Sequence, residues 1–260
     1  MKINGNFPEN RARRGLPTVQ GAIYLAEGGN GVPLAVMDSI SVTIARTGAA
    51  TAVAARHLAR IDARAAFICG AGVQGHIQLR AVKHACPLER AFVFDIDPKA
   101  STALAERMSV ELDIPTAAAP DLAIARDCDI VVTCTSARRA FLGPDQVGPG
   151  AFVAAVGADN HDKQEIDPAL FARATVVVDS LEQCAEIGDL HHALAVGSVT
   201  REAVYATLAE IVAGQKPGRR SAEEVTLFDS TGLGLQDVAA AAAIYERALA
   251  RGAGTRLSLA

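Results

Sequence analysis

The chain has 260 residues, half of them hydrophobic, and a formal charge of −4, so it can bury a substantial core in one large domain or two small ones. The acidic balance and the lack of any basic stretch longer than two arginines argue against a nucleic-acid partner, and no apolar run reaches the ~18 residues that a membrane span needs. Five scattered cysteines without a C-x-x-C pair, and a start without a signal-peptide core, predict reduced thiols, no metal site and a cytoplasmic location.

The first forty residues predict a small antiparallel unit. Residues 5–15 are typical of loops, and Thr18–Leu25 then has the composition of a strand. A second strand at Pro33–Asp38 follows the turn residues Gly28–Gly31, so the pair predicts a hairpin. A two-stranded hairpin is marginal by itself in water and must pack on another element.

A helix is predicted next, over Ser41–Arg60. Apolar residues recur there at helical spacing, and Ser41 and Thr43 are the candidate N-caps. The helix leads directly into a short apolar strand at Ala65–Cys69.

That strand runs without a linker into a G-x-G-x-x-G turn, and a helix is predicted from His76 to about Lys83. Each glycine has a mechanical reason. Gly70 allows the tight exit from the strand, Gly72 lets the backbone approach a pyrophosphate, and Gly75 lets the helix pack close to the sheet. The helix N-terminus offers free N–H groups and a positive dipole end to the phosphates.

An acid stands where such a unit holds the adenosine ribose. A second apolar strand ends in Asp95, about 20 residues after the turn. Ile96 and Asp97 follow it, so no arginine is present to accept a 2′-phosphate, and the carboxylate would repel one. The sequence therefore favours NAD over NADP. The alternative is an ordinary strand-to-helix turn with an unrelated acid.

From residue 65 to 180 strands alternate with helices, which is typical of a doubly wound parallel sheet with right-handed crossovers. Strands are predicted at Ala65–Cys69, Ala91–Asp95, Asp129–Thr135, Ala151–Gly157, Thr175–Asp179 and Val225–Asp229. Helices are predicted at Lys99–Leu112, Leu181–Ala195, Thr200–Ala213 and Gln236–Ala250.

The predicted architecture is a Rossmann-type α/β domain with a second, discontinuous α+β lobe. The NAD-binding domain would span residues 61–225. Residues 1–60 and 226–260 would form the substrate and oligomerisation lobe, and the groove between lobe and domain would hold the active site.

Ligands of an open parallel sheet lie beyond the carboxyl ends of its strands. One predicted strand ends in Thr133–Ser136, whose hydroxyls could reach the nicotinamide ribose or could cap the strand end. Another ends in Val156–Asp159. Gly157 would let the chain pass close to a flat ring, and Asp159 could take or give a proton beside it. The alternative for Asp159 is a turn-forming or helix-capping acid, since Pro168 opens a helix soon after.

Two cations outside the dinucleotide domain could face the groove, Lys2 and Arg46. A guanidinium matches a carboxylate bidentately, so Arg46 is a natural anchor for an acidic substrate. The alternative is a surface arginine paired along its helix. His191 and His192 lack further ligands, and neighbours on a helix point apart, so they are interpreted as surface or packing residues.

Essentially end to end, the chain resembles the ornithine cyclodeaminase/mu-crystallin family. The family also includes an archaeal type of alanine dehydrogenase and ketimine or pyrroline-2-carboxylate reductases. The motifs that carry the resemblance are Lys2 with Asn4-Gly5, Pro8-Glu9-Asn10, Gly15-Leu16-Pro17-Thr18-Val19, Arg46-Thr47-Gly48-Ala49-Ala50, the turn at residues 70–75, Val156-Gly157-Ala158-Asp159 with Lys163, and Phe228-Asp229-Ser230-Thr231-Gly232.

The resemblance implies roles that spacing alone does not give. Asp159 matches the catalytic acid/base, and Lys2 matches a catalytic lysine that holds the substrate's carboxylate or carbonyl group. Arg46 matches a position that contacts both cofactor and substrate carboxylate, and Thr231 lies beside the substrate. The matching cofactor positions are Thr18, Thr47, Gly70, Gly72, Val73, Gln74, Gly75, Asp95, Thr135, Val156, Gly157, Ala158, Asp159, Lys163 and Ser230.

The resemblance also implies an activity. The expected reaction is hydride transfer between NAD and the α-carbon of a small amino or imino acid, with cyclisation and ammonia loss if the substrate is like ornithine. An alanine dehydrogenase or a ketimine or pyrroline-2-carboxylate reductase is the alternative, and the partner expected is a second copy in a homodimer.

Family members carry a further segment before the Lys2 motif, with the opening strands of the substrate lobe and an arginine that clamps the substrate carboxylate. The lobe is therefore expected to be truncated here. That departure leaves open a non-catalytic nicotinamide-nucleotide-binding protein like mu-crystallin.

Overall fold

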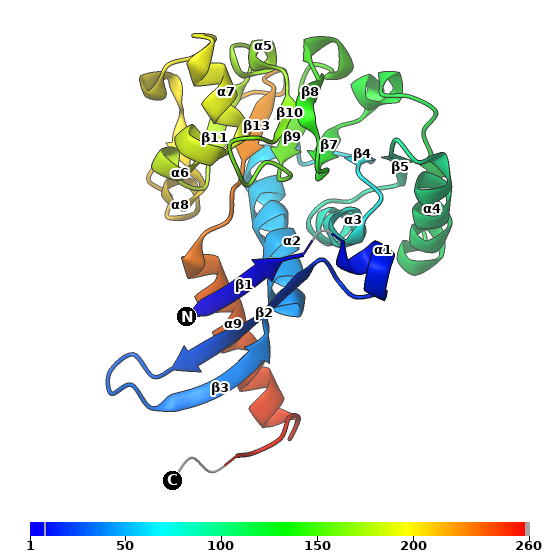
Figure 1. The fold of residues 1–260 in the computed structure, drawn as a ribbon. Helices are drawn as coiled ribbons and strands as arrows, with labels where there is room; N and C mark the ends of the chain where they lie inside the picture. The colour runs from blue at the N-terminus through cyan, green and yellow to red at the C-terminus, as the bar shows by residue number, and fades with distance from the viewer. Residues whose placement is uncertain (8, 258–260) are drawn as a thin grey trace. The chain divides into compact units, whose positions relative to one another are not determined.

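A computed structural model describes residues 1–7 and 9–257 of the chain (Figure 1). Pro8, part of one of the motifs above, lies outside the described residues. The chain divides into two compact units. The smaller comprises Met1–Arg46 and Leu233–Ala260, and the larger comprises Thr47–Gly232.

Parallel strands form the larger unit's sheets. In its main sheet they are β4 (Ala65–Cys69), β5 (Arg90–Phe94), β6 (Thr116–Ala118), β7 (Ile130–Thr133), β9 (Phe152–Ala155), β11 (Thr175–Val178), β12 (Ala206–Thr207) and β13 (Thr226–Asp229). The order across this sheet is β12-β11-β13-β9-β7-β4-β5-β6. Its direction along the chain reverses between β4 and β7, as in a doubly wound dinucleotide fold. A separate parallel pair joins β8 (Arg138–Leu142) and β10 (Gln164–Ile166).

Helices connect these strands. The α-helices of the larger unit are α3 (Val73–Ala85), α4 (Pro98–Leu112), α5 (Pro168–Phe171), α6 (Leu181–Ile187), α7 (Asp189–Ala195) and α8 (Leu208–Val212), with the end of α2 (Ser39–Leu58). Short 3₁₀ turns are η1 (Ala123–Asp127), η2 (Pro144–Gln146) and η3 (Arg201–Ala203). The Rossmann-type α/β fold predicted from the sequence is confirmed.

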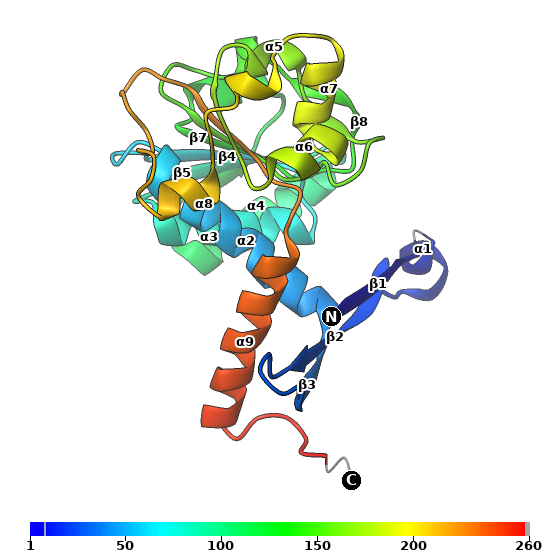
Figure 2. The same ribbon diagram turned by 90° about the vertical axis from the view of Figure 1, so that its left-hand side faces the viewer.

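The main sheet separates two buried cores. Along β4 the side chains alternate, so that Ile68 enters one core and Phe67 the other. Helices α2, α3, α4 and α8 close the Ile68 side, and α5, α6 and α7 close the Phe67 side (Figure 2). All the residues of β4, β7, β9 and β13 are buried, which explains why β4 and β9 are apolar throughout.

Several elements of the larger unit differ from the sequence predictions. Strands β6, β8 and β10 were not predicted, and α3 begins at Val73 and not at His76. The strand predicted at residues 225–229 is β13, which lies between β9 and β11 in the main sheet, so the division falls at residues 232/233 and not at 225/226. The helix predicted at residues 181–195 is interrupted at Gly188. The helix predicted at residues 200–213 is instead η3, β12 and α8, because Thr207 and Glu210 form a capping box that starts α8 late.

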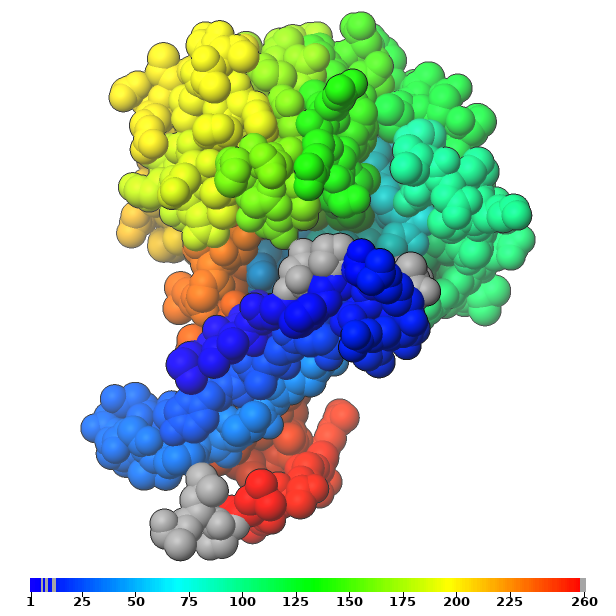
Figure 3. Space-filling view, in the orientation of Figure 1, coloured from blue at the N-terminus to red at the C-terminus, as the bar shows by residue number. Residues whose placement is uncertain are grey.

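The smaller unit is an antiparallel sheet with a helix against it. Its strands are β1 (Lys2–Asn6), β2 (Val19–Ala26) and β3 (Pro33–Asp38), and its helices are α1 (Asn10–Arg14), the start of α2, and α9 (Gly234–Ala250). Ile23, Leu25, Val42 and Ala241 form its core. Segments from both ends of the chain, blue and red in Figure 3, form its surface. The prediction of a loop at residues 5–15 was wrong, because pairing with β2 extends Gly5 and Asn6 and a helical turn follows.

The N-cap of α2 also differs from prediction. Asp38, not Ser41 or Thr43, accepts the first free N–H groups of the helix, from Ile40 (3.3 Å) and Ser41 (2.8 Å). Hydrogen bonds from Ser41 hold the pKa of the Asp38 carboxyl below its ordinary value. Across residues 1–7 and 9–257, no helix combines the length and the apolar character that crossing a membrane requires.

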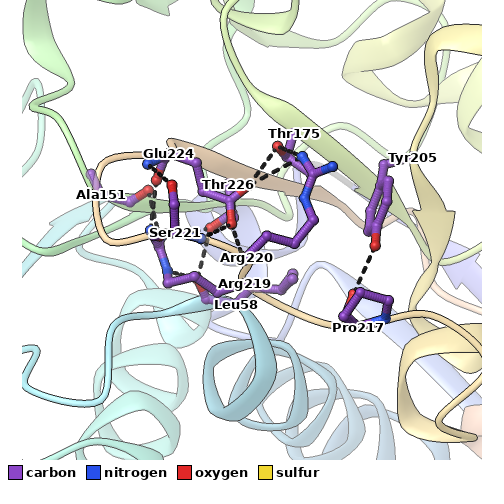
Figure 4. A network of polar contacts seen from close by, with 10 residues as sticks. All are labelled: Leu58, Ala151, Thr175, Tyr205, Pro217, Arg219, Arg220, Ser221, Glu224 and Thr226. Carbon is purple, nitrogen blue, oxygen red and sulfur yellow. Dashed lines mark hydrogen bonds and ion pairs between the residues drawn. The ribbon is translucent and has the colours of Figure 1, made fainter.

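At the amino ends of β9 and β13, Arg219 joins these two strands to α2 (Figure 4). Its Nε donates to the Leu58 carbonyl that ends α2 (2.7 Å), and its Nη1 donates to the Glu224 carbonyl (2.6 Å). Its Nη2 donates to the Ala151 carbonyl before β9 (3.3 Å) and to the Thr226 hydroxyl on β13 (3.1 Å). Arg219 therefore ties the segment between α8 and β13 into the larger unit.

Candidate functional site

The glycine turn has the geometry that its sequence predicts. Gly70 follows β4 with φ +109°, and a Cβ there would come 2.9 Å from the Cys134 carbonyl oxygen. A Cβ on Gly75 would collide with the Gly70 carbonyl oxygen, so α3 can approach the strand only with glycine there. Gly72 is the N-cap of α3 and has open space beside it. It provides no side-chain cap, so the first N–H groups of α3 are available to an anion.

Asp95 follows β5 and binds the glycine turn directly. Its Oδ2 accepts the N–H of Ala71 (2.7 Å) and its Oδ1 accepts the N–H of Asp97 (3.0 Å). An ionised carboxylate has about four lone-pair positions, so both oxygens can accept further hydrogen bonds, for example from ribose hydroxyls. The two residues after Asp95 are the exposed Ile96 and Asp97, so neither offers a positive charge to a 2′-phosphate.

The ends of β7 and β9, neighbours in the sheet, are joined by a residue that the sequence analysis missed. Glu165 on β10 is fully buried. Its Oε1 accepts the N–H of Thr135 (2.5 Å) and its Oε2 accepts the N–H of Gly157 (2.9 Å). A Cβ on Gly157 would collide with this carboxylate, which is a reason for glycine independent of any bound ring. The Thr135 hydroxyl accepts the N–H of Ala137 (3.1 Å) and so caps the strand end.

Asp159 is an exposed acid at the end of β9. Its carboxylate forms an ion pair with Lys163 (Nζ to Oδ1, 2.7 Å), and Lys163 also donates to the Gly157 carbonyl (3.1 Å). The helix-capping alternative for Asp159 is wrong, because Asp167 caps α5 by accepting the N–H of Ala169 (2.8 Å). Asp159 is thus a carboxylate that solvent can reach, fixed by one cation.

The two histidines on α7 both hydrogen-bond to backbone carbonyls, and their rings meet edge-on with centroids 5.1 Å apart, so they do not point apart as predicted. His192 Nε2 lies 2.8 Å from the Lys163 carbonyl oxygen, and His191 Nδ1 lies 3.3 Å from that of Ala185. A carbonyl can only accept, so each of these nitrogens carries the proton. His192 thereby holds the backbone of Lys163.

Ser230 and Thr231, which follow β13, share one buried acid. Asp179 Oδ2 accepts the hydroxyl of Ser230 (3.1 Å) and the N–H of Gly232 (2.7 Å), and its Oδ1 accepts the hydroxyl of Thr231 (3.2 Å). Both hydroxyls therefore donate inward, and only their lone pairs remain for a ligand.

Two further buried acids, Asp189 and Asp229, hydrogen-bond to backbone N–H groups near the carboxyl ends of these strands. Asp189 Oδ1 accepts the N–H groups of Glu165 (2.7 Å) and Ile166 (2.9 Å), and Asp229 Oδ2 accepts that of Leu190 (2.8 Å). Burial, with the nearby charge of Asp189, raises the pKa of Glu165 to about 7. Burial raises the pKa of Asp189 to about 6. Burial, with the charge of Asp189, also raises the pKa of Asp229.

In the smaller unit, Lys2 and Arg46 share one carboxylate. Lys2 Nζ lies 3.1 Å from both oxygens of Asp237, and Arg46 Nε lies 3.1 Å from Asp237 Oδ1. Arg46 Nη1 donates to Gln236 (3.2 Å). Two cations against one anion leave a net positive charge, which suits a carboxylate ligand. The interpretation of Arg46 as a surface residue paired along its own helix is wrong, because its partners lie on α9.

The structure thus gathers most predicted site residues at the carboxyl ends of β4, β5, β7, β9 and β13: the turn at residues 70–75, Asp95, Thr135, Val156, Gly157, Ala158, Asp159, Lys163, Ser230 and Thr231. Val73 and Gln74 begin α3, and Thr47 lies in α2. Lys2, Thr18 and Arg46 belong to the smaller unit. Sequence reasoning missed Glu165, Asp179, Asp189, Asp229 and Asp237. Only Asp179 and Asp229 gave a signal, as acids at the ends of apolar strands.

Comparison with known proteins connects this arrangement to enzymes. The family model for the ornithine cyclodeaminase/mu-crystallin family matches residues 1–252. The structure of Δ¹-pyrroline-2-carboxylate reductase from Thermococcus litoralis, in complex with NADH and L-proline, is 37% identical with a TM-score of 0.94 over 98% of this chain and 80% of that one.

Two further similar structures are of a dehydrogenase and a cyclodeaminase. An archaeal alanine dehydrogenase dimer with bound NAD is 37% identical with a TM-score of 0.94, over 100% of this chain and 80% of that one. A lysine cyclodeaminase structure that addresses recognition of L-lysine, L-ornithine and L-2,4-diaminobutyric acid is 32% identical with a TM-score of 0.86, over 100% of this chain and 74% of that one.

Proposed function

Because this chain belongs to the ornithine cyclodeaminase/mu-crystallin family, we propose that it transfers a hydride between NAD and the α-carbon of a small amino or imino acid. The observation that carries the proposal is Asp159, an exposed carboxylate held by Lys163 and not used to cap a helix. It stands on the same sheet edge as the glycine turn, where dinucleotide folds bind their ligands.

The residues of the larger unit fit a nicotinamide dinucleotide. Gly72 leaves open space beside the uncapped start of α3, where backbone N–H groups can bind a pyrophosphate. Asp95 has lone pairs left for the adenosine ribose and would repel a 2′-phosphate, which supports NAD over NADP. When bound, NAD supplies the hydride acceptor or donor, and the protein supplies orientation and proton transfer.

The proposed proton steps use Asp159. In the oxidative direction its carboxylate takes a proton from the ammonium group of the amino acid, so that the nitrogen lone pair can form the C=N bond of a protonated imine as the α-hydrogen leaves as hydride. In the reductive direction Asp159 returns that proton to the nitrogen. Because the side chain is exposed, the proton can exchange with solvent. Lys2 and Arg46 are proposed to hold the substrate carboxylate.

An oxidoreductase is favoured over a cyclodeaminase within this proposal. The dehydrogenase and reductase structures superpose with a TM-score of 0.94 at 37% identity, against 0.86 and 32% for the lysine cyclodeaminase. We therefore propose a dehydrogenase or imine reductase first. A cyclodeaminase would use the same proton transfers, with a side-chain amine attacking the imine, ammonia leaving and the hydride returning.

The test is a substrate panel with two readouts. Purified protein is incubated with alanine, proline, lysine or ornithine and NAD, and with pyrroline-2-carboxylate or pyruvate plus ammonia and NADH. Net change in NADH absorbance, equal to substrate consumed, identifies an oxidoreductase. Ammonia release without net NADH identifies a cyclodeaminase. NAD binding by calorimetry without turnover on any of these substrates would reject the enzymatic proposal in favour of a nucleotide-binding protein.

The alanine dehydrogenase compared above is a dimer. We propose a homodimer for this chain as well. Light scattering of the purified protein tests the proposal, and a monomeric mass would overturn it.

A further inference from the structure

A buried carboxylate joins the two strand ends on which the proposed reaction depends. Glu165 accepts the N–H groups of Thr135, after β7, and Gly157, after β9. Hydrogen bonds to an ionised acceptor are about twice as strong as neutral ones. Asp159 lies two residues beyond Gly157, so this bridge fixes the backbone from which the Asp159 segment continues.

The position of the Glu165 carboxylate is itself fixed. Its backbone N–H is held by Asp189 at the start of α7, together with that of Ile166. Gly157 has no Cβ, and the space that a Cβ would fill is occupied by the carboxylate of Glu165. The hydrogen bonds from the Glu165 and Ile166 backbone to Asp189, and the contact with Gly157, together fix the position of the Glu165 carboxylate.

This geometry needs a side chain with two acceptors and no donor at its end. Glutamine has the same length but turns an NH₂ group toward one of the two N–H groups, so one hydrogen bond becomes a repulsive contact. Aspartate keeps both acceptors but is one methylene shorter.

We infer that Glu165 is a positioning residue for the proposed hydride transfer: it sets the spacing between Thr135 and the Gly157–Asp159 segment, and so holds Asp159 in place without touching the substrate. This inference rests on the proposed function. It assigns the precision of the proton transfer to a residue on β10 that contacts the backbone of Thr135 and Gly157.

The bridge should depend on pH, because a protonated carboxyl keeps only one good acceptor oxygen and gains a donor. The ionisable groups that face Glu165 are Asp189 on α7, Cys69 on β4 and Cys134 after β7. Burial raises the pKa of both thiols well above their ordinary value, so these stay neutral. The remaining charge is that of Asp189, which raises the pKa of Glu165 together with burial.

The first arm of the test measures the two hydrogen bonds to Glu165 directly by NMR and needs no enzyme assay. In the ¹⁵N-labelled full chain, the backbone amide proton resonances of Thr135 and Gly157 should both show an inflection near pH 7 as pH is varied from 5 to 9. Glu165→Gln should abolish that inflection. Two amides that titrate independently, or an inflection that persists in Glu165→Gln, would overturn the inference.

The second arm reads the reaction on the active substrate at pH 8. Glu165→Gln should lower kcat by about 10- to 100-fold, the scale of loss for a small misplacement of reacting groups, with KM within about threefold of wild type. The matched control is Asp167→Asn, which removes a carboxylate two residues away while asparagine still caps α5, and it should stay within about twofold. A Glu165→Gln kcat equal to that of the control would contradict the inference.

The two failures are distinguishable. A wild-type protein with no turnover rejects the proposed function, whereas the amide titration still decides whether Glu165 bridges the strand ends. If Glu165→Gln does not fold, the wild-type titration alone carries the decision.

Discussion

At the scale of single residues, Asp159 shows how function can be separated from structure. The residue is exposed, caps no helix and contacts Lys163 and Asn160. Removing its charge should therefore leave folding intact. By contrast, the acids behind it hold backbone N–H groups and serve structure first.

Asp159→Asn should abolish proton transfer while cofactor binding survives. We expect kcat to fall by about 10²- to 10⁴-fold, the usual contribution of a general acid or base, with the NAD dissociation constant changed by less than about threefold. Steady-state kinetics on the active substrate and NAD calorimetry check this. Lys99→Gln, outside the site, is the control. A variant with full kcat would remove Asp159 from the mechanism.

At the same scale, pH should reveal the buried acids. The pKa of Glu165 is raised from 4.5 to about 7, and that of Asp189 from 3.8 to about 6. Between the ordinary pKa and the raised pKa of each group, the unfolded chain has released the carboxyl proton that the folded chain still holds. The stability contributed by these groups is therefore present at low pH and is lost as pH rises through the folded pKa values.

The corresponding measurement compares wild type with Glu165→Gln by urea unfolding from pH 5 to 8. Relative to the variant, wild type should lose roughly 1–3 kcal/mol of unfolding free energy over this range. The comparison cancels the titrating groups that do not interact with Glu165. An unfolding free-energy difference that stays constant across the range would show that Glu165 does not titrate there.

At the scale of elements, the glycine turn gives two substitutions with opposite signatures. Gly72→Ala meets open space at φ −82°, so the fold should be unchanged, yet the added methyl would stand where the pyrophosphate of NAD is proposed to bind. We expect NAD affinity to fall at least about tenfold with Tm unchanged. Gly75→Ala collides with the Gly70 carbonyl oxygen and should lower Tm.

Calorimetry and thermal unfolding on both variants decide between these outcomes. Equal loss of stability in Gly72→Ala and Gly75→Ala would contradict the separate roles. Unchanged NAD affinity in Gly72→Ala would place the pyrophosphate elsewhere.

Arg219 is a second element-scale test, because it joins α2, β9 and β13 at the opposite edge of the sheet. Arg219→Met would remove the hydrogen bonds to Leu58, Ala151 and Thr226 and leave the Glu224 carbonyl without a donor, and we expect a loss of about 3 kcal/mol in the free energy of unfolding. Arg220→Met is the matched neighbour. Arg220 is half exposed and stacks on Tyr205, with its Cζ 4.5 Å from the ring centroid, so its loss should cost less than about 1 kcal/mol. Similar losses would refute the assignment.

Elements were predictable where the local pattern agrees with the tertiary environment. The bounds of β3 and β4 match the predicted ranges, since their strand character is local. Pairing defines β1, whose sequence Lys-Ile-Asn-Gly-Asn has little strand character of its own. The helix predicted at residues 200–213 failed because a local capping box overrode a helical pattern.

At the scale of the whole molecule, the dinucleotide fold and its strand-end residues followed from the sequence, but the connections between them did not. Glu165 carries no motif, and only the folded chain brings it to Thr135 and Gly157. Asp237 likewise meets Lys2 from the far end of the chain. Contacts between residues so distant in sequence depend on topology, which composition and spacing do not encode locally.

The place of β13 has a consequence for how the protein is made. Its residues are among the last of the larger unit to leave the ribosome, yet they fill the gap between β9 and β11. Until then both of those strands present unpaired, apolar edges that can recruit other nascent chains. A premature stop codon shortly before Thr226 should therefore yield aggregates, whereas one after the strand has been completed would spare the sheet.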